Sequence, residues 1–169
     1  MALIPFRGVM PRVAEGVFVA ESAQVIGDVT LMEGSSVWYN VVIRGDNDSV
    51  TIGRDTNIQD NVTIHVDSGS PCVIEDGVSV GHGAVVHGCT VRRHALVGIH
   101  AIVLNDAEIG EDAIIGAGAV VGSGKVIPAR SLAVGVPAKV IREISDGDAA
   151  ENAARAERYA ALAQEHRKG

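Results

Sequence analysis

Three histidines, His65, His82 and His87, lie where a repeating sequence breaks or tightens its period. Imidazole nitrogens are good zinc ligands, and three protein ligands are what a catalytic zinc ion uses while it keeps one coordination position open for water. Such an ion lowers the pKa of the bound water to about 7, which makes the water a nucleophile at neutral pH. The trio therefore predicts metal-assisted hydration or hydrolysis.

The elements that must position these histidines are indicated by a six-residue period. Aliphatic residues recur every six positions from Val91 to Ile127, and an alanine stands four places after each of the first five. A hexapeptide repeat with large and small interior positions is typical of a parallel β-helix, whose coils stack on one another. The sequence thus predicts an all-β solenoid. Gly98 and Gly110, which follow the aliphatic residue, are expected to serve sharp turns.

The same phase extends upstream in three further runs, and the junctions between the runs are irregular. The steps from Ile43 to Ile52, from Ile64 to Ile74 and from Val86 to Val91 are not six residues long. Insertions in solenoids usually map to loops on one face, often the binding face. The irregular steps contain the residues Arg44, Asp46, His65 and His87.

The three histidines differ in their phase within the repeat. His65 and His87 directly follow an interior aliphatic residue, whereas His82 comes two places after one. Because side chains alternate along a strand, His82 is expected to project in a different direction. We therefore expect His65 and His87 of one chain to meet His82 of the next in a cyclic homotrimer. The structural alternative is an interface of hydrogen-bonded histidines without metal. His94, His100 and His166 are interpreted as polar turn residues.

Composition excludes several classes of partner. The net charge of -7 and the pI near 5.3 argue against nucleic acid and acidic membranes, because the overall field would repel both. No apolar run is long enough to span a bilayer, and the N-terminal segment does not resemble a signal peptide, so a cytoplasmic protein is expected. Cys72 and Cys89 are expected to be buried thiols.

A change of pattern after Pro137 predicts two parts, a β-helix over residues 1–142 and a C-terminal helix over residues 143–169 packed on it. Ser145 and Asp148 are spaced like a capping box, with Asp in place of the usual Glu or Gln. Alanines then recur at steps of four and three from Ala149 to Ala163, which predicts a small-residue seam for close packing.

Several segments resemble the gamma-class carbonic anhydrase family of hexapeptide-repeat proteins. The resemblance lies in Arg44-Gly45-Asp46, in Asn57-Ile58-Gln59-Asp60 followed by His65, and in the run from Gly81 to Cys89 that holds His82 and His87. It implies a left-handed, three-sided β-helix, a homotrimer, and reversible hydration of CO2 to bicarbonate. It also implies zinc bound by His65, His82 and His87, the middle one from the adjacent subunit.

The resemblance implies roles for six further residues. Arg44 and Asp46 match an ion pair across the trimer interface, Gln59 matches the polar neighbour of the metal-bound water, and Asn57, Asp60 and Tyr159 match residues that support the pocket. A purely structural interface pair for Arg44 and Asp46, and turn formation by Asn57 and Asp60, are the alternatives.

The sequence also departs from the family pattern. Active members carry a long acidic loop after the first zinc histidine, but Val66 to Pro71 is short and offers only Asp67, and a second family glutamate is replaced by Asn47. Since fast turnover needs a suitable proton acceptor, zinc binding is predicted more firmly than rapid hydration. Fe²⁺ or Co²⁺ suits the same three imidazoles.

Two other functions remain open. Gly135 to Arg142 resembles the closing segment of hexapeptide acyltransferases, in which Lys139 and Arg142 would face the phosphates of an acyl-CoA; thioester hydrolysis at the metal is a variant of this activity. The alternative for this segment is a turn from the last coil into the helix. A third possibility is a metal-bound trimeric scaffold with little catalysis.

Overall fold

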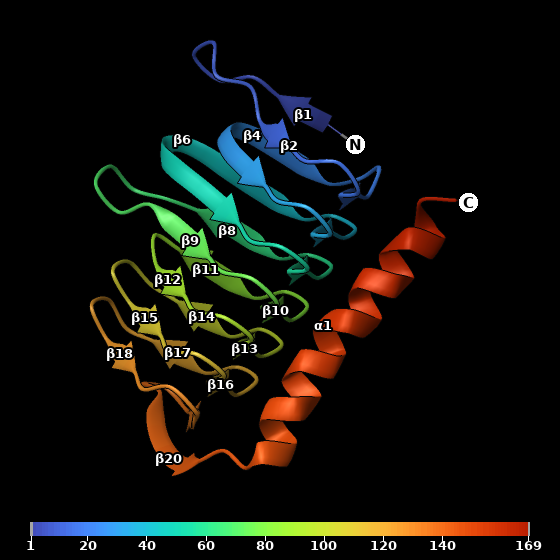
Figure 1. The fold of residues 1–169 in the computed structure, drawn as a ribbon. Helices are drawn as coiled ribbons and strands as arrows, with labels where there is room; N and C mark the ends of the chain where they lie inside the picture. The colour runs from blue at the N-terminus through green and yellow to red at the C-terminus, as the bar shows by residue number, and fades with distance from the viewer. Residues whose placement is uncertain (1, 169) are drawn as a thin grey trace.

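The protein, described here by a computed structural model of residues 2–168, is a left-handed parallel β-helix with one C-terminal helix (Figure 1). Short strands wind around a narrow interior in three faces, and strand partners on successive coils are parallel. The predicted fold class is therefore confirmed.

The strands of each face lie in register along the stack of coils. The first face contains β1 (Ala2–Ile4), the first part of β4 (Gln24–Leu31) and of β6 (Val42–Ile52), β8 (Thr63–His65), β11 (Val85–His87), β14 (Ile102–Val103) and β17 (Val120–Val121). The second contains β2 (Arg12–Val13), the later parts of β4 and β6, β9 (Cys72–Ile74), β12 (Thr90–Val91), β15 (Glu108–Ile109) and β18 (Val126–Ile127). The third contains β3 (Phe18–Val19), β5 (Ser36–Val37), β7 (Asn57–Ile58), β10 (Ser79–Val80), β13 (Leu96–Val97), β16 (Ile114–Ile115), β19 (Ser131–Val134) and β20 (Lys139–Glu143).

The six-residue period produces the core directly. On the first face the interior residues Ile43, Ile64, Val86 and Val103 are register partners on successive coils, and all are fully buried. The small interior positions are filled by alanines, which are buried as well. Cys72 and Cys89 are buried thiols, as predicted, and contact with Cys72 together with burial raises the pKa of Cys89.

Gly98 and Gly110 serve close stacking of coils rather than sharp turns. Neither has a positive φ. A Cβ on Gly98 would lie 2.8 Å from the carbonyl carbon of Gly116 on the next coil, and one on Gly110 would lie 2.7 Å from the Cα of Ala129. The prediction from the sequence was therefore wrong about the cause, because the missing side chain matters for the neighbouring coil and not for the backbone conformation.

His94 and His100 lie in corner turns with φ of 55°, which confirms their interpretation as turn residues. His166 is different, because it is the last residue of helix α1 (Asp146–His166). Its ring packs edge-on against Trp38, with centroids 5.0 Å apart, and its Nδ1 lies 3.0 Å from the hydroxyl of Tyr39. His166 therefore fixes the end of the helix to the first coils.

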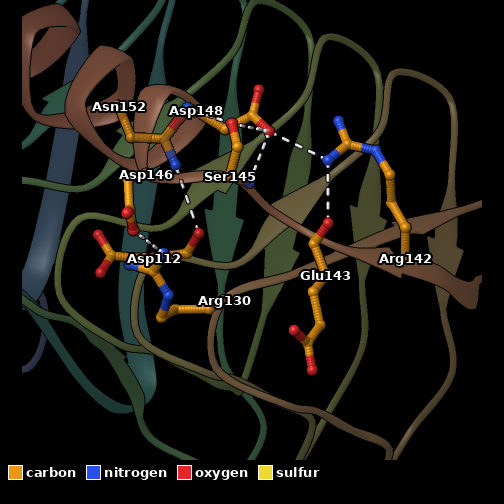
Figure 2. Close-up of polar contacts among 8 residues, drawn as sticks. All are labelled: Asp112, Arg130, Arg142, Glu143, Ser145, Asp146, Asp148 and Asn152. Atoms are coloured by element: carbon orange, nitrogen blue, oxygen red, sulfur yellow. Dashed lines mark hydrogen bonds and ion pairs between the residues drawn. The ribbon is translucent and has the colours of Figure 1, made fainter.

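The chain leaves the last coil through a hairpin, which the sequence did not predict. Strand β20 turns back antiparallel to β19, where a direct passage from the coil into the helix was expected. The predicted capping box at the start of α1 is present: the Ser145 hydroxyl accepts from the Asp148 backbone N–H, and Asp148 accepts from the Ser145 backbone N–H. Figure 2 shows Arg142 reaching the same Asp148 carboxylate, at 3.0 Å.

Helix α1 runs along the third face from the last coil back toward the first (Figure 1). It contacts β3, β5, β7 and β10 through a seam in which Ala156 and Ala163 are buried. The seam also contains Asn152, which donates to the backbone carbonyl of Asp112 (Figure 2). No helix within residues 2–168 is long and apolar enough to cross a membrane.

Candidate metal centre

Neighbouring strands of the first face bring Arg44, His65 and His87 into one row. Arg44 is the register partner of His65, and His65 is the register partner of His87. Each directly follows a fully buried interior residue. Because side chains alternate along a strand, the three side chains project from the outer surface of this face.

His65 and His87 face each other through one ring nitrogen each. The Nδ1 of His65 lies 2.9 Å from the Nε2 of His87. The other nitrogen of His65, Nε2, lies 3.0 Å from the Asp46 carboxylate, and the other nitrogen of His87, Nδ1, contacts the amide oxygen of Asn105. We call His65 and His87, with Asp46 and Asn105, the two-histidine half.

Asp46 also forms an ion pair with Arg44 of the same chain. Burial acts to raise the pKa of Asp46, but the hydrogen bonds from Arg44 and His65 outweigh it and hold that pKa below its usual range. Asp46 is therefore an ionised acceptor for the His65 ring. The pairing of Arg44 and Asp46 across two subunits stays a prediction.

The short loop after His65 reaches the same place. Ligating atoms of His65, Asp67 and His87 all lie within 4.8 Å of one another, and within residues 2–168 this is the one group of three such residues that could hold a metal ion. One oxygen of Asp67, however, accepts a hydrogen bond of 2.7 Å from the amide nitrogen of Asn105.

His82 lies outside this group, in the turn that follows β10. Its Nδ1 lies 2.8 Å from the carboxylate of Asp60, the residue one coil earlier, and its side chain is 43% exposed. Gln59 is buried and donates to the amide oxygen of Asn57, which in turn donates to the hydroxyl of Ser79. We call His82, Asp60, Gln59 and Tyr159 the single-histidine half.

A groove of about 430 Å³ opens beside His82. Gln59 and His82 line it, Leu96, Ile99 and Ile114 supply apolar surface, and Tyr159 lines it from α1. Burial, and then the Asp60 carboxylate, raises the pKa of Tyr159, so its phenol is protonated at neutral pH.

The structure thus gathers the predicted site residues into two groups. Arg44 and Asp46 lie with His65 and His87; Asn57, Gln59, Asp60 and Tyr159 lie around His82. Asn57 is a buried strand residue, so turn formation does not explain it. Asn105 was missed. The one available signal was its place in the repeat, two residues after interior Val103, at the position that Gly88 has one coil earlier.

The two-histidine half fits a metal ion by its chemistry. The Asp46 carboxylate can only accept, so the Nε2 of His65 carries the hydrogen and its Nδ1 offers a lone pair toward His87. Two nitrogens 2.9 Å apart need a proton or a cation between them. Neutral imidazoles whose outer nitrogens are held by acceptors are typical of zinc sites.

The stacked coils and the outward-facing histidines define a hexapeptide-repeat β-helix protein. A protein-family model described as bacterial transferase hexapeptide (six repeats) matches residues 88–123. A crystal structure of a hexapeptide transferase family protein from Anaplasma phagocytophilum superimposes with a TM-score of 0.94 at 36% identity, and the match covers 96% of each chain.

Two curated relatives narrow the class. The "Probable carbonic anhydrase" of Methanocaldococcus jannaschii is 52% identical over 152 residues, which cover 90% of this chain and 96% of that protein. Gamma carbonic anhydrase 3, mitochondrial, of Arabidopsis thaliana is 51% identical over 162 residues, which cover 92% of this chain and 63% of the plant protein. The chain belongs to the gamma-class carbonic anhydrase family.

Proposed function

We propose that the protein is a homotrimeric, zinc-dependent carbonic anhydrase. The metal is shared by the two-histidine half of one chain and the single-histidine half of the next. The observation that carries the proposal is the separation of the halves. His65 and His87 face each other, while His82 lies outside their group and has its own carboxylate partner. The names of the relatives supply the reaction, reversible hydration of CO2.

The contacts of each residue indicate its role in the proposed reaction. A bound zinc ion supplies an acidified water for addition to the carbon of CO2. Asp60 holds His82 Nδ1, which leaves its Nε2 as the ligand atom. Asn57 accepts from the amide nitrogen of Gln59, so the amide oxygen of Gln59 is free to orient the water. Arg44, with its side chain 43% exposed, is placed to steady a bicarbonate oxygen.

Proton removal is the expected weak step. Asp67 is held by Asn105, and the amide nitrogen of Asn47, at the place of a family glutamate, lies 3.4 Å from the backbone carbonyl of Val66. Neither contact provides an acceptor that is free to carry protons to solvent. We therefore expect the rate of hydration to rise with the concentration of an external buffer.

A subunit-complementation experiment tests the shared site. His82→Ala removes the single-histidine ligand, and His87→Ala removes one ligand of the two-histidine half, so each variant alone is expected to lack bound zinc and activity. When the two chains are co-assembled in equal amounts, about a quarter of the interfaces of a cyclic trimer combine an intact half from each chain. CO2 hydration by stopped flow and zinc content should both recover to about that fraction.

A site formed within one chain gives the opposite result, since no mixture of the two variants restores it. Recovery of zinc without CO2 hydration would support the metal-bound scaffold in place of the enzyme. His100→Asn is the matched control, because His100 is an exposed turn histidine whose positive φ asparagine tolerates.

A transferase acting on acyl-CoA is the second candidate. The name of the Anaplasma relative and the apolar surface of the groove favour it. The contacts of Arg142 do not, because its guanidinium is bound to Asp148 and to the backbone carbonyl of Glu143 (Figure 2). A transferase needs no metal, so activity on acetyl-CoA with an amine acceptor that survives His87→Ala and chelation would favour it.

A further inference from the structure

The hydrogen-bond partner of His87 is a residue that neither the repeat nor the family resemblance marked. Asn105 belongs to the coil after His87, in the turn that follows β14. Its amide oxygen contacts the Nδ1 of His87. The partner of His65, in contrast, is the charged Asp46. An amide has an oxygen and a nitrogen of similar shape, so its effect on His87 depends on which one faces the ring.

Asp67 fixes the orientation of that amide. The Asp67 carboxylate accepts a hydrogen bond of 2.7 Å from the Asn105 amide nitrogen. A carboxylate only accepts, so it must face the NH₂ group, and the oxygen of the amide is left facing His87. An acceptor facing Nδ1 requires the hydrogen of neutral His87 to be on Nδ1. The lone pair then lies on Nε2, the nitrogen that faces His65.

The backbone around this contact is arranged to hold it. The short loop after His65 is closed by a hydrogen bond from the Ser70 backbone N–H to the Asp67 carbonyl, 3.0 Å long, and Ser70 Oγ donates to Asp106 at 2.9 Å. Gly88 has a φ of 49°, and a Cβ there would lie 2.9 Å from the Ser70 carbonyl oxygen and 3.2 Å from the Asn105 amide oxygen. A side chain at position 88 would therefore press on both the loop and the amide.

We propose that Asn105 is a positioning residue that fixes the tautomer of His87, and that Asp67 fixes Asn105. The short loop thus sets the direction of a ligand atom, and Asp67 serves as an anchor rather than as a metal ligand or a proton carrier. The tautomer of His87 does not depend on the proposed reaction. The effect on metal affinity rests on the proposed metal site.

The tautomer is read directly from long-range proton–nitrogen NMR correlations of the imidazole rings in metal-free, nitrogen-labelled protein, at a pH at which one proton lies between the facing nitrogens of His65 and His87 in place of the cation. Wild type is expected to show the His87 hydrogen on Nδ1. Asn105→Leu, of similar size without an acceptor, is expected to move it to Nε2 in a substantial fraction of molecules. Zinc affinity, from competition with a chromophoric chelator, should fall by about 10- to 100-fold.

Exchanging the residues at positions 67 and 105, which leaves the net charge unchanged, tests whether the pattern of hydrogen-bond donors and acceptors or the identity of each residue fixes the tautomer. Asp67→Asn combined with Asn105→Asp keeps one amide and one carboxylate but reverses their places. The carboxylate at 105 still accepts from His87, so the tautomer and the zinc affinity are expected to return to those of wild type. Ser70→Ala is the control for loosening of the loop, because it removes the contact with Asp106 and leaves Asn105 with both partners.

Three results would overturn the proposal: a wild-type hydrogen on Nε2, an Asn105→Leu protein with unchanged tautomer, or an equal loss of zinc affinity in Ser70→Ala. Failure of the carbonic anhydrase function has a different signature. In that case the tautomer follows the expected pattern in every variant while wild-type protein does not hydrate CO2.

Discussion

The two halves of the candidate site differ in how firmly they hold their histidines. In the two-histidine half both rings stand on adjacent strands, and each outer nitrogen has a hydrogen-bond acceptor; the side chains of His65 and Asp46 are 16% and 14% exposed. In the single-histidine half His82 lies in a turn and its ring contacts the Asp60 carboxylate. The side chains of His82 and Asp60 are more exposed, at 43% and 33%. The first half is preorganised on the strand ladder, whereas the second is less constrained.

The halves also differ in the chemistry around them. Arg44, Asp46 and Asp67 place charges beside His65 and His87. Around His82 there is one carboxylate, that of Asp60, and a groove that offers an amide, a protonated phenol and aliphatic side chains, with arginines from α1 that are paired to Glu151. This difference suggests that the first half chiefly binds the metal and that the second chiefly receives an uncharged substrate.

Loss of a ligand from the two-histidine half should have the largest effect. His87→Ala leaves His65 without its facing nitrogen, so bound zinc is expected to be lost and kcat/KM for CO2 hydration to fall by about a thousandfold or more, ~4 kcal/mol. Elemental analysis and stopped-flow hydration measure the two effects. A variant that keeps both its zinc and its rate would show that His87 is not a ligand.

Loss of the carboxylate that holds a histidine should weaken zinc binding more in the two-histidine half than in the single-histidine half. Asp46→Asn is expected to lower zinc affinity by about 10- to 100-fold, because an ionised acceptor with two partners, Arg44 and His65, is lost. Asp60→Asn should have a smaller effect, since water can replace the carboxylate beside the more exposed His82. Zinc competition assays on the two variants compare them directly, and a larger loss in Asp60→Asn would reverse the proposed ranking.

The difference between the halves also explains what the sequence was able to predict. The fold follows from spacing, because Ile43, Ile64 and Val86 are register partners in the interior. His65 and His87 come one residue after this column, so their common face was predicted from strand alternation. Strand β20 was not predicted, since Lys139–Glu143 is exposed throughout and has no interior periodicity.

Contacts between coils were harder to predict. Asn105 meets His87 and Asp67 through a turn, and no spacing rule states which turn residue of one coil reaches a strand residue of another. The same limit applies to His82 and Asp60, although these residues occupy equivalent positions on successive coils. The residues of the site were predictable as types and positions, whereas the hydrogen-bond partners that orient them required the structure.

Tyr159→Phe should affect the rate without affecting the metal. Tyr159 lines the groove of the single-histidine half, and the raised pKa keeps its phenol a hydrogen-bond donor at neutral pH. Removal of the hydroxyl is expected to lower kcat/KM about fivefold, corresponding to one hydrogen bond of ~1 kcal/mol. Zinc content should stay at the wild-type level. A variant that loses zinc would assign Tyr159 to the metal-holding part of the site.

The smallest expected effect concerns the helix that carries Tyr159. The Ser145 backbone N–H, and then Arg142 and the Ser145 hydroxyl, hold the pKa of Asp148 below its usual range. The stability that Asp148 contributes is therefore fully present above about pH 3.9, the ordinary pKa of an aspartate, and is lost as the pH falls through the lowered value. Asp148→Asn should lower the urea midpoint of unfolding at pH 7, and should lower it only slightly at pH 2.5.

The single tryptophan reports on helix docking, since Trp38 packs edge-on against Tyr159 with centroids 5.4 Å apart. Its fluorescence should change in Asp148→Asn at lower urea than in wild type at neutral pH, while release of zinc should follow the unfolding of the β-helix, which carries His65, His82 and His87, and should keep its wild-type urea midpoint. If zinc release and the Trp38 signal shifted together in this variant, α1 and the β-helix would unfold as one cooperative unit, and holding of the metal by the β-helix without the docked helix would be wrong.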